Sequence, residues 1–110
     1  MTAAERQAQA LQQLQRLAAA DAFARSLGIR FVNGGPGSAT VTMTIGEQHL
    51  NFNGTCHGGA IFALADAAFG LASNSHGLVA AGIAAHITYQ VAANLGDELL
   101  ARATEVSRSP

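Results

Sequence analysis

The sequence predicts an α+β fold in which an antiparallel sheet covers one central helix. Three observations support this fold class: an amphipathic N-terminal segment, stretches in which apolar and polar residues alternate, and an apolar run between a Gly-Gly pair and a polar turn. A chain of 110 residues is long enough for one hydrophobic core but not for two. We therefore expect one folded domain over residues 27–110, preceded by a helical extension over residues 1–26.

The N-terminal segment is expected to be helical over residues 3–26, because it is rich in Ala, Gln, Leu and Arg. Its apolar residues recur at helical spacing, at Leu11, Leu14, Leu17 and Ala18. Asp21 can cap a second short helix that carries Phe23 and Leu27 toward the core. Gly28 is a suitable residue to end that helix.

Two short strands should follow and pair as a hairpin. We expect the first over residues 29–32, a turn over residues 33–37 and the second strand over residues 38–45. In the second strand, threonines alternate with the apolar residues Ala39, Val41, Met43 and Ile45. This alternation is typical of a strand that buries one face.

A polar loop over residues 46–55 leads to the central helix, which should begin at Gly58-Gly59 and run to about Ser73. Residues 79–90 and 98–106 then favour strands, with a turn over residues 92–96 between them. Four strands are few for a helix that is apolar on nearly every side. We expect two further strands, about 15 to 25 residues, beyond Pro110.

Composition excludes several classes of partner. The net charge of −1 and the pI of 6.4 give no electrostatic basis for binding nucleic acid or an anionic membrane. Cys56 is the single cysteine and cannot form an internal disulfide, and the polar N-terminus does not resemble a signal peptide, so we expect a cytoplasmic protein. The many alanines and the lack of Trp predict a thin core, which favours burial of apolar surface against a second copy.

Asp66 is the most informative residue, because it is the one charge in the apolar run 60–72. Burying a charge costs several kcal/mol, so an acid expected to be buried there is either paired or retained for chemistry. Gly58 and Gly59 open the same helix, where free N–H groups can stabilise an oxyanion. With His57 and Asn51 nearby, Asp66 as base or nucleophile would complete the groups needed for acyl hydrolysis. Taken alone, however, a Gly-Gly pair more often only caps a helix.

The segment from Leu50 to Asp66 closely resembles the hotdog-fold thioesterases of the phenylacetate-degradation (PaaI) type. The similarity extends over most of residues 21–108, including residues 41–44, 73–77 and 87–89. It implies a helix wrapped in a curved antiparallel sheet, assembly into dimers and a homotetramer, and hydrolysis of acyl-CoA thioesters such as (hydroxy)phenylacetyl-CoA or related aryl or medium-chain esters. No cofactor is implied.

The resemblance also implies roles for individual residues. The catalytic carboxylate falls on Asp66, the loop asparagine on Asn51, the oxyanion amide on Gly58 and a neighbouring histidine on His57. The carboxylate would come from one subunit, and the asparagine and glycine from the other. The expected substrate-binding residues are Gly59, Phe52, Gly82 and His86. The chain departs from its relatives at Gly82, where a hydroxyl residue can orient water, and at Val91-Ala92, where an Arg-Pro pair is common.

Other readings remain open from the residues alone. Cys56 next to His57 could be a nucleophile, although a small buried thiol is expected more often. The four histidines do not have metal-ligand spacing, so we expect no metal. A dehydratase or hydratase of the same fold, or a non-catalytic module that binds acyl thioesters, are the alternatives to a hydrolase.

Overall fold

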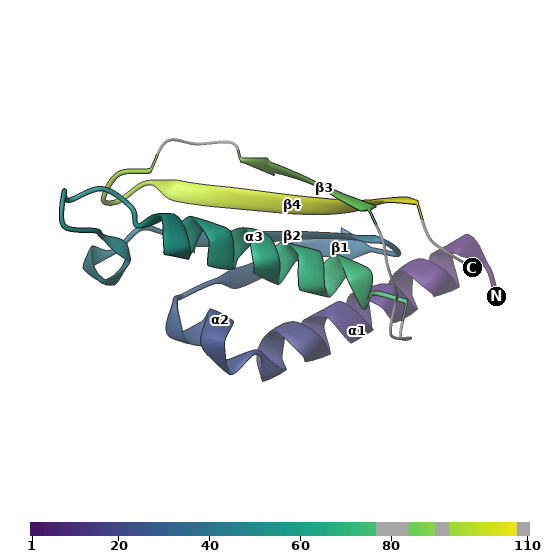
Figure 1. Cartoon of the computed structure of the whole chain (residues 1–110). Coiled ribbons are helices and arrows are strands. Elements are labelled where there is room, and N and C mark those ends of the chain that lie inside the picture. The colour runs from purple at the N-terminus through teal and green to yellow at the C-terminus, as the bar shows by residue number, and fades with distance from the viewer. Residues whose placement is uncertain (77–83, 90–92, 108–110) are drawn as a thin grey trace.

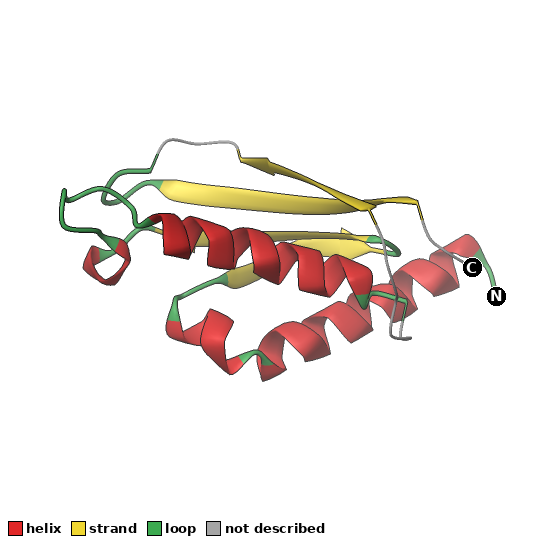
Figure 2. Ribbon diagram, viewed as in Figure 1, coloured by secondary structure: helices red, strands yellow, loops and turns green. Residues whose placement is uncertain are grey.

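The sheet is four-stranded and antiparallel, with strand order β1-β2-β4-β3. The computed structural model describes residues 1–76, 84–89 and 93–107 (Figure 1). The strands are β1 (Arg30–Gly35), β2 (Ser38–Thr44), β3 (Ala84–Tyr89) and β4 (Glu98–Ser107). The helix α3 (Gly58–Ser73) lies across this sheet, and α1 (Ala3–Ala20) and α2 (Ala22–Ser26) lie beside it (Figure 2). The predicted α+β fold is confirmed.

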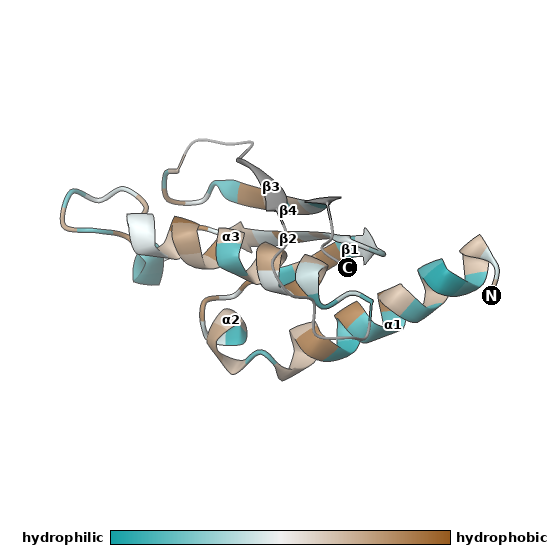
Figure 3. Ribbon diagram, turned by 45° about the vertical axis from the view of Figure 1, so that its right-hand side comes forward, coloured by the Kyte–Doolittle hydropathy of each residue, from teal (hydrophilic) through white to brown (hydrophobic). Residues whose placement is uncertain are grey.

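The predicted break in the N-terminal segment is present. Thr2 and Glu5 form a capping box that starts α1, and Asp21 starts α2 by accepting a hydrogen bond of 3.0 Å from the Ala24 N–H. Gly28, with φ of 75°, then turns the chain into β1. Apolar residues gather on the half of α1 that leads into α2 (Figure 3).

One prediction for this segment is wrong. Phe23 does not enter the core but is 67% exposed, whereas Ala24 is buried and Leu27 packs against the core. The physical reason is the Asp21 cap, which fixes the phase of the short helix α2 and turns its small residue inward.

The β1–β2 hairpin forms as expected, but its turn is tighter than predicted. The strands extend to the Gly35–Ser38 pair, so that only Pro36 and Gly37 form the turn. Gly34 belongs to β1 rather than to the turn, because α1 packs directly on it: a Cβ there would lie 2.7 Å from the Leu14 side chain.

The core lies between α3 and the sheet. The alternation predicted for the second strand is confirmed, because Ala39, Val41, Met43 and Ile45 are all buried. From the opposite side of the core, α3 contributes Ala60, Leu64, Ala68 and Leu71. Within the sheet, the neighbouring strand β4 contributes Leu99, Ala101 and Ala103. Thr42 is buried as well, and its hydroxyl is satisfied by donating to the Leu99 carbonyl at 2.9 Å. Alanines fill much of this interior, as the composition predicted.

Most of the bulky aromatic surface stays outside this core. Phe62 and Phe52 are 71% and 97% exposed, and Phe69 is 36% exposed. Burying one phenyl side chain contributes about 1.5–3 kcal/mol, so the single chain leaves much stabilisation unused. The interior is therefore as thin as the sequence suggested. For the part of the chain that the structure describes, no helix is long and apolar enough to cross a membrane.

Candidate active site

Asp66 lies on the exposed side of α3, not in the core. The expectation that a single chain buries this charge is therefore wrong. The helical repeat places Phe62 and Phe69 within about 60° of Asp66 around the helix axis, so the acid sits in an exposed stripe with two aromatic rings. The buried stripe of α3, which includes Leu64 and Ala68, faces the sheet instead.

The start of α3 is capped by a side chain that sequence reasoning had assigned to the reaction. His57 is the N-cap residue, and its Nδ1 accepts a hydrogen bond of 2.7 Å from the Gly59 N–H. The Gly59 amide is therefore occupied. The Gly58 N–H makes no hydrogen bond to the described residues, and the space where a Gly58 Cβ would lie is open. Of the two glycine amides, Gly58 is the one positioned to bind a ligand oxygen.

Asn51 shapes the loop that leads into α3. Its Oδ1 accepts hydrogen bonds from the backbone N–H groups of Asn53 at 2.8 Å and Thr55 at 3.2 Å, and its Nδ2 donates to the Thr55 hydroxyl at 3.1 Å. A short bridge between Leu50 and Cys56 closes the loop. In a single chain Asn51 thus organises its own loop and does not contact Asp66.

His49 is a structural residue of this site that sequence reasoning missed. The residue is 2% exposed. The Nδ1 atom accepts from the Gly46 N–H at 2.9 Å, so the neutral ring carries its proton on Nε2, which donates to the Leu27 carbonyl at 2.7 Å. The His49 carbonyl also accepts from the His57 N–H. His49 therefore ties the end of α2 to both ends of the loop that holds Asn51. No sequence motif marks this role.

The groups proposed for catalysis are separated within one chain. Gly58 and Asp66 are eight residues apart on α3, which at 1.5 Å per residue is about 12 Å along the axis. A thioester carbonyl bound at the Gly58 amide is therefore out of reach of the carboxylate of the same chain. The two halves of the predicted site do not meet in the single chain.

One cavity adjoins Asp66, and a separate one adjoins His57 and Gly59 at the start of α3. The first, which we call the Asp66 groove, has a volume of about 240 Å³ and runs between the end of α1 and α3. Its lining residues are Leu17, Asp21, Asp66, Ala67, Gly70, Leu71 and Asn74. The second, the α3 N-terminal pocket, has a volume of about 290 Å³ and is lined by Phe23, Leu27, Gln48, His49, Leu50, His57, Gly59 and Ala60.

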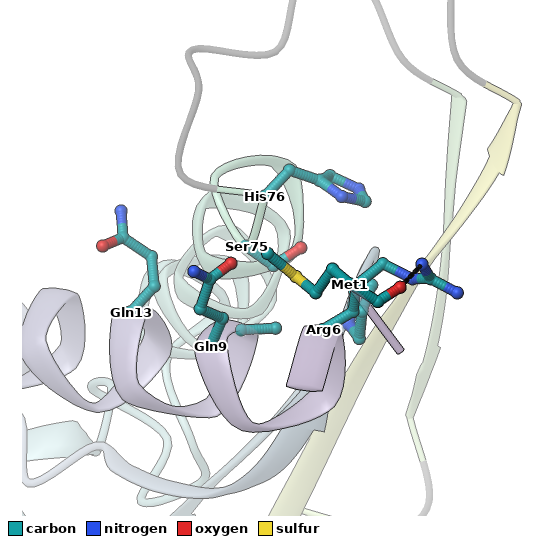
Figure 4. Close-up of a pocket in the computed structure, with 8 residues that line it drawn as sticks. Met1, Arg6, Gln9, Gln13, Ser75 and His76 are labelled. Carbon is teal, nitrogen blue, oxygen red and sulfur yellow. Dashed lines mark hydrogen bonds between the residues drawn. The ribbon is translucent and has the colours of Figure 1, made fainter. Parts of the chain in front are cut away.

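A larger cavity of about 410 Å³ contains none of the predicted site residues. It lies between the N-terminal turns of α1 and the end of α3, with Arg6, Gln9 and His76 among its lining residues (Figure 4). Two of its polar groups already have structural partners: the His76 ring lies 2.9 Å from a carboxylate oxygen of Glu105, and the buried Ser75 hydroxyl accepts from the Gly37 N–H at 2.7 Å.

Cys56 is a buried thiol, as expected. Burial raises the pKa of Cys56 above its ordinary value, which keeps it in the protonated, poorly nucleophilic form. Its Sγ lies 3.6 Å from the His57 carbonyl oxygen. This environment is that of a structural cysteine.

Of the remaining predicted residues, Phe52 lines neither cavity. Gly82 lies outside the described residues, and for His86 the structure describes only the backbone, which pairs with Thr104. Phe52 projects from the loop tip. Within residues 1–76, 84–89 and 93–107, no three His, Cys, Asp or Glu residues gather in a way that could hold a metal ion.

Comparison with known proteins assigns this chain to a family. The model of the thioesterase superfamily matches residues 53–109. The chain is 46% identical over 83 residues to the acyl-coenzyme A thioesterase PaaI of Escherichia coli, covering 76% of this chain and 59% of that protein. It is 54% identical over 71 residues to a putative esterase of Archaeoglobus fulgidus, covering 64% of this chain and 46% of that protein. The chain thus spans about half the length of these relatives.

The solved structures agree with the sequence matches. The structure of the E. coli PaaI protein from the phenylacetic acid degradation operon superimposes with a TM-score of 0.82 and 38% identity, covering 94% of this chain and 75% of that one. A mutant PaaI from Thermus thermophilus gives a TM-score of 0.69 and 39% identity over 81% of this chain and 76% of that one. The chain belongs to the thioesterase superfamily and has the PaaI-type hotdog fold that the sequence predicted.

Proposed function

We propose that the protein hydrolyses acyl-CoA thioesters at sites shared between two copies of the chain. Asp66 of one copy would act together with Asn51 and Gly58 of its partner. The observation that carries this proposal is the separation of about 12 Å along α3 between Gly58 and an exposed Asp66. A second copy is what can bring the two halves to one thioester carbon.

The surface around Asp66 supports such an assembly. Phe62 and Phe69 flank the acid and are exposed in the single chain. Contiguous exposed apolar side chains are the usual mark of an interaction surface, and most homo-oligomers pair by a twofold axis. A dimer of dimers, as the resemblance implies, is the proposed assembly, which light scattering of the purified protein tests.

The proposed reaction consumes water and a thioester and releases a carboxylic acid and free thiol. The Gly58 N–H donates to the carbonyl oxygen as negative charge develops on it, aided by the positive end of the α3 dipole. Asp66 either removes a proton from the attacking water or attacks the carbonyl carbon itself, forming an anhydride that water then cleaves. Both routes break the C–S bond, and CoA leaves as the thiol.

The proposed substrates are aryl-acetyl or medium-chain acyl-CoA esters in the cytoplasm. Release of free thiol from phenylacetyl-, hydroxyphenylacetyl- and octanoyl-CoA distinguishes a hydrolase from a dehydratase or hydratase, which leaves the thioester intact. A module that only binds such esters would release no thiol from any of them.

The direct test is Asp66→Asn, which keeps the size of the side chain and removes its charge and basicity. Turnover should fall by about 10² or more, the usual effect of losing a positioned acid–base group, while the melting temperature stays unchanged. The matched control is Asp97→Asn, since Asp97 caps the turn before β4 and lies outside both cavities. Full activity of Asp66→Asn would refute the proposal.

A further inference from the structure

The Asp66 groove brings part of the N-terminal extension next to the proposed catalytic acid. Leu17 and Asp21 come from the end of α1 and the junction with α2, and the other wall belongs to α3. α1 and α3 are in contact, and Figure 1 shows that they approach each other near the C-terminal end of α3. The proposed chemistry gave these residues of α1 no role.

Position restricts what the groove can hold. If Asp66 reacts as proposed, the thioester carbon must lie about 3–3.5 Å from its carboxylate, or one water molecule away. The groups attached to that carbon must then occupy the nearest free space. On the Gly70 side of Asp66 that space is the groove, whereas the Phe62 and Phe69 side faces the proposed partner.

The negative charge of the groove favours the acyl end of the substrate over its CoA end. Two carboxylates, Asp21 and Asp66, line the groove, and no arginine lines it among the described residues. The phosphates of CoA would be repelled from such a surface, whereas an uncharged acyl group would not. The volume is also adequate, because a cavity of about 150 Å³ holds benzene and the groove has about 240 Å³.

We propose that the Asp66 groove is the acyl-binding subsite, and that Leu17 of α1 and Gly70 of α3 set the size of the acyl group. This inference rests on the proposed function. Gly70 lies one turn beyond Asp66 on α3, and a Cβ built there meets no atom within 4 Å. A side chain at position 70 would therefore project into free space beside the acid without disturbing the fold.

The experiment fills the groove from either wall. Gly70→Leu and, separately, Leu17→Phe are assayed with acetyl-, octanoyl- and phenylacetyl-CoA. Each variant should lower kcat/KM for the two larger esters by about tenfold or more, the range that one or two misplaced methylene groups produce, and change acetyl-CoA by less than about threefold. Two variants are used so that a folding defect in one does not decide the result.

The matched control is Ala19→Leu. Ala19 is exposed on α1 about 200° around the helix from Leu17 and does not line the groove, so the same bulk is added away from the subsite. Its selectivity among the three esters should equal that of the unmodified protein.

A second arm tests the charge. Asp21→Asn removes one carboxylate but keeps a good N-cap for α2. The variant should raise kcat/KM for succinyl-CoA, whose acyl end is anionic, several-fold relative to butyryl-CoA. Hydrolysis with unchanged acyl selectivity in Gly70→Leu and Leu17→Phe would overturn the subsite while leaving the proposed function intact. Absence of hydrolysis for every ester in the unmodified protein would instead refute the function.

Discussion

Replacing His49 should destabilise the protein and weaken catalysis together, because one buried ring holds the loop of Asn51 in place. His49→Ala leaves the Gly46 N–H and the Leu27 carbonyl without their partners at 2.9 and 2.7 Å. Each buried polar group left unsatisfied costs about 1–3 kcal/mol. We expect a loss of about 3 kcal/mol in the free energy of unfolding.

For a domain of this size the unfolding entropy near the melting temperature is about 0.23 kcal/mol per degree, at 2.1 cal/mol/K per residue. The expected loss therefore lowers the melting temperature by about 13 °C. Differential scanning calorimetry measures this shift. Thiol release, assayed well below the new melting temperature, should show a reduced kcat/KM because the loop then holds Asn51 less rigidly.

The control is Glu47→Ala in the same short turn, because the Glu47 side chain is exposed. It should alter stability by less than about 0.5 kcal/mol. If His49→Ala melts within about 2 °C of the unmodified protein, the ring is not the anchor that its hydrogen bonds indicate.

Two further predictions concern the start of α3. Gly58→Ala should fold normally because its Cβ meets open space, but it should lower turnover by crowding the Gly58 amide. Gly59→Ala should instead lower the melting temperature, because its Cβ would lie 2.9 Å from His57 Nδ1. Kinetics and calorimetry on both variants separate the two effects. The raised pKa of Cys56 keeps the thiol protonated at a pH where an exposed thiol ionises. Iodoacetamide near pH 8 should therefore modify the native protein much more slowly than the urea-unfolded protein. Equal rates of modification would contradict the burial of Cys56.

The sequence predicted the elements well where a local signal existed. Apolar periodicity and glycine punctuation located α3 at its observed ends, and the Asp21 cap located the break between α1 and α2. The buried side of the second strand followed from its alternation. These features depend on neighbours in the chain, which a sequence displays.

What the sequence did not predict depends on contacts between distant residues. Asp66 was expected to be buried because its neighbours are apolar, but the helix turns that position away from the sheet. The His57 ring occupies the Gly59 amide, and His49 joins the end of α2 to the loop of Asn51. Side-chain orientation of this kind leaves no periodic pattern.

The predicted site, which combines Asp66 with Asn51 and Gly58, stays a prediction about two chains. Within one chain, Asp66 lines one cavity, whereas His57 and Gly59 at the start of the same helix line another, and a sequence cannot show where a second copy lies.

Mixing two inactive variants tests that central claim most directly. Asp66→Asn and Asn51→Ala chains carrying different tags are co-expressed, and the mixed dimer is purified through both tags. One of its two sites would then combine an intact Asp66 with an intact Asn51, so the mixed dimer should show about half of the unmodified turnover. Activity no higher than that of the two parent variants would show that Asp66 and Asn51 do not act across the interface.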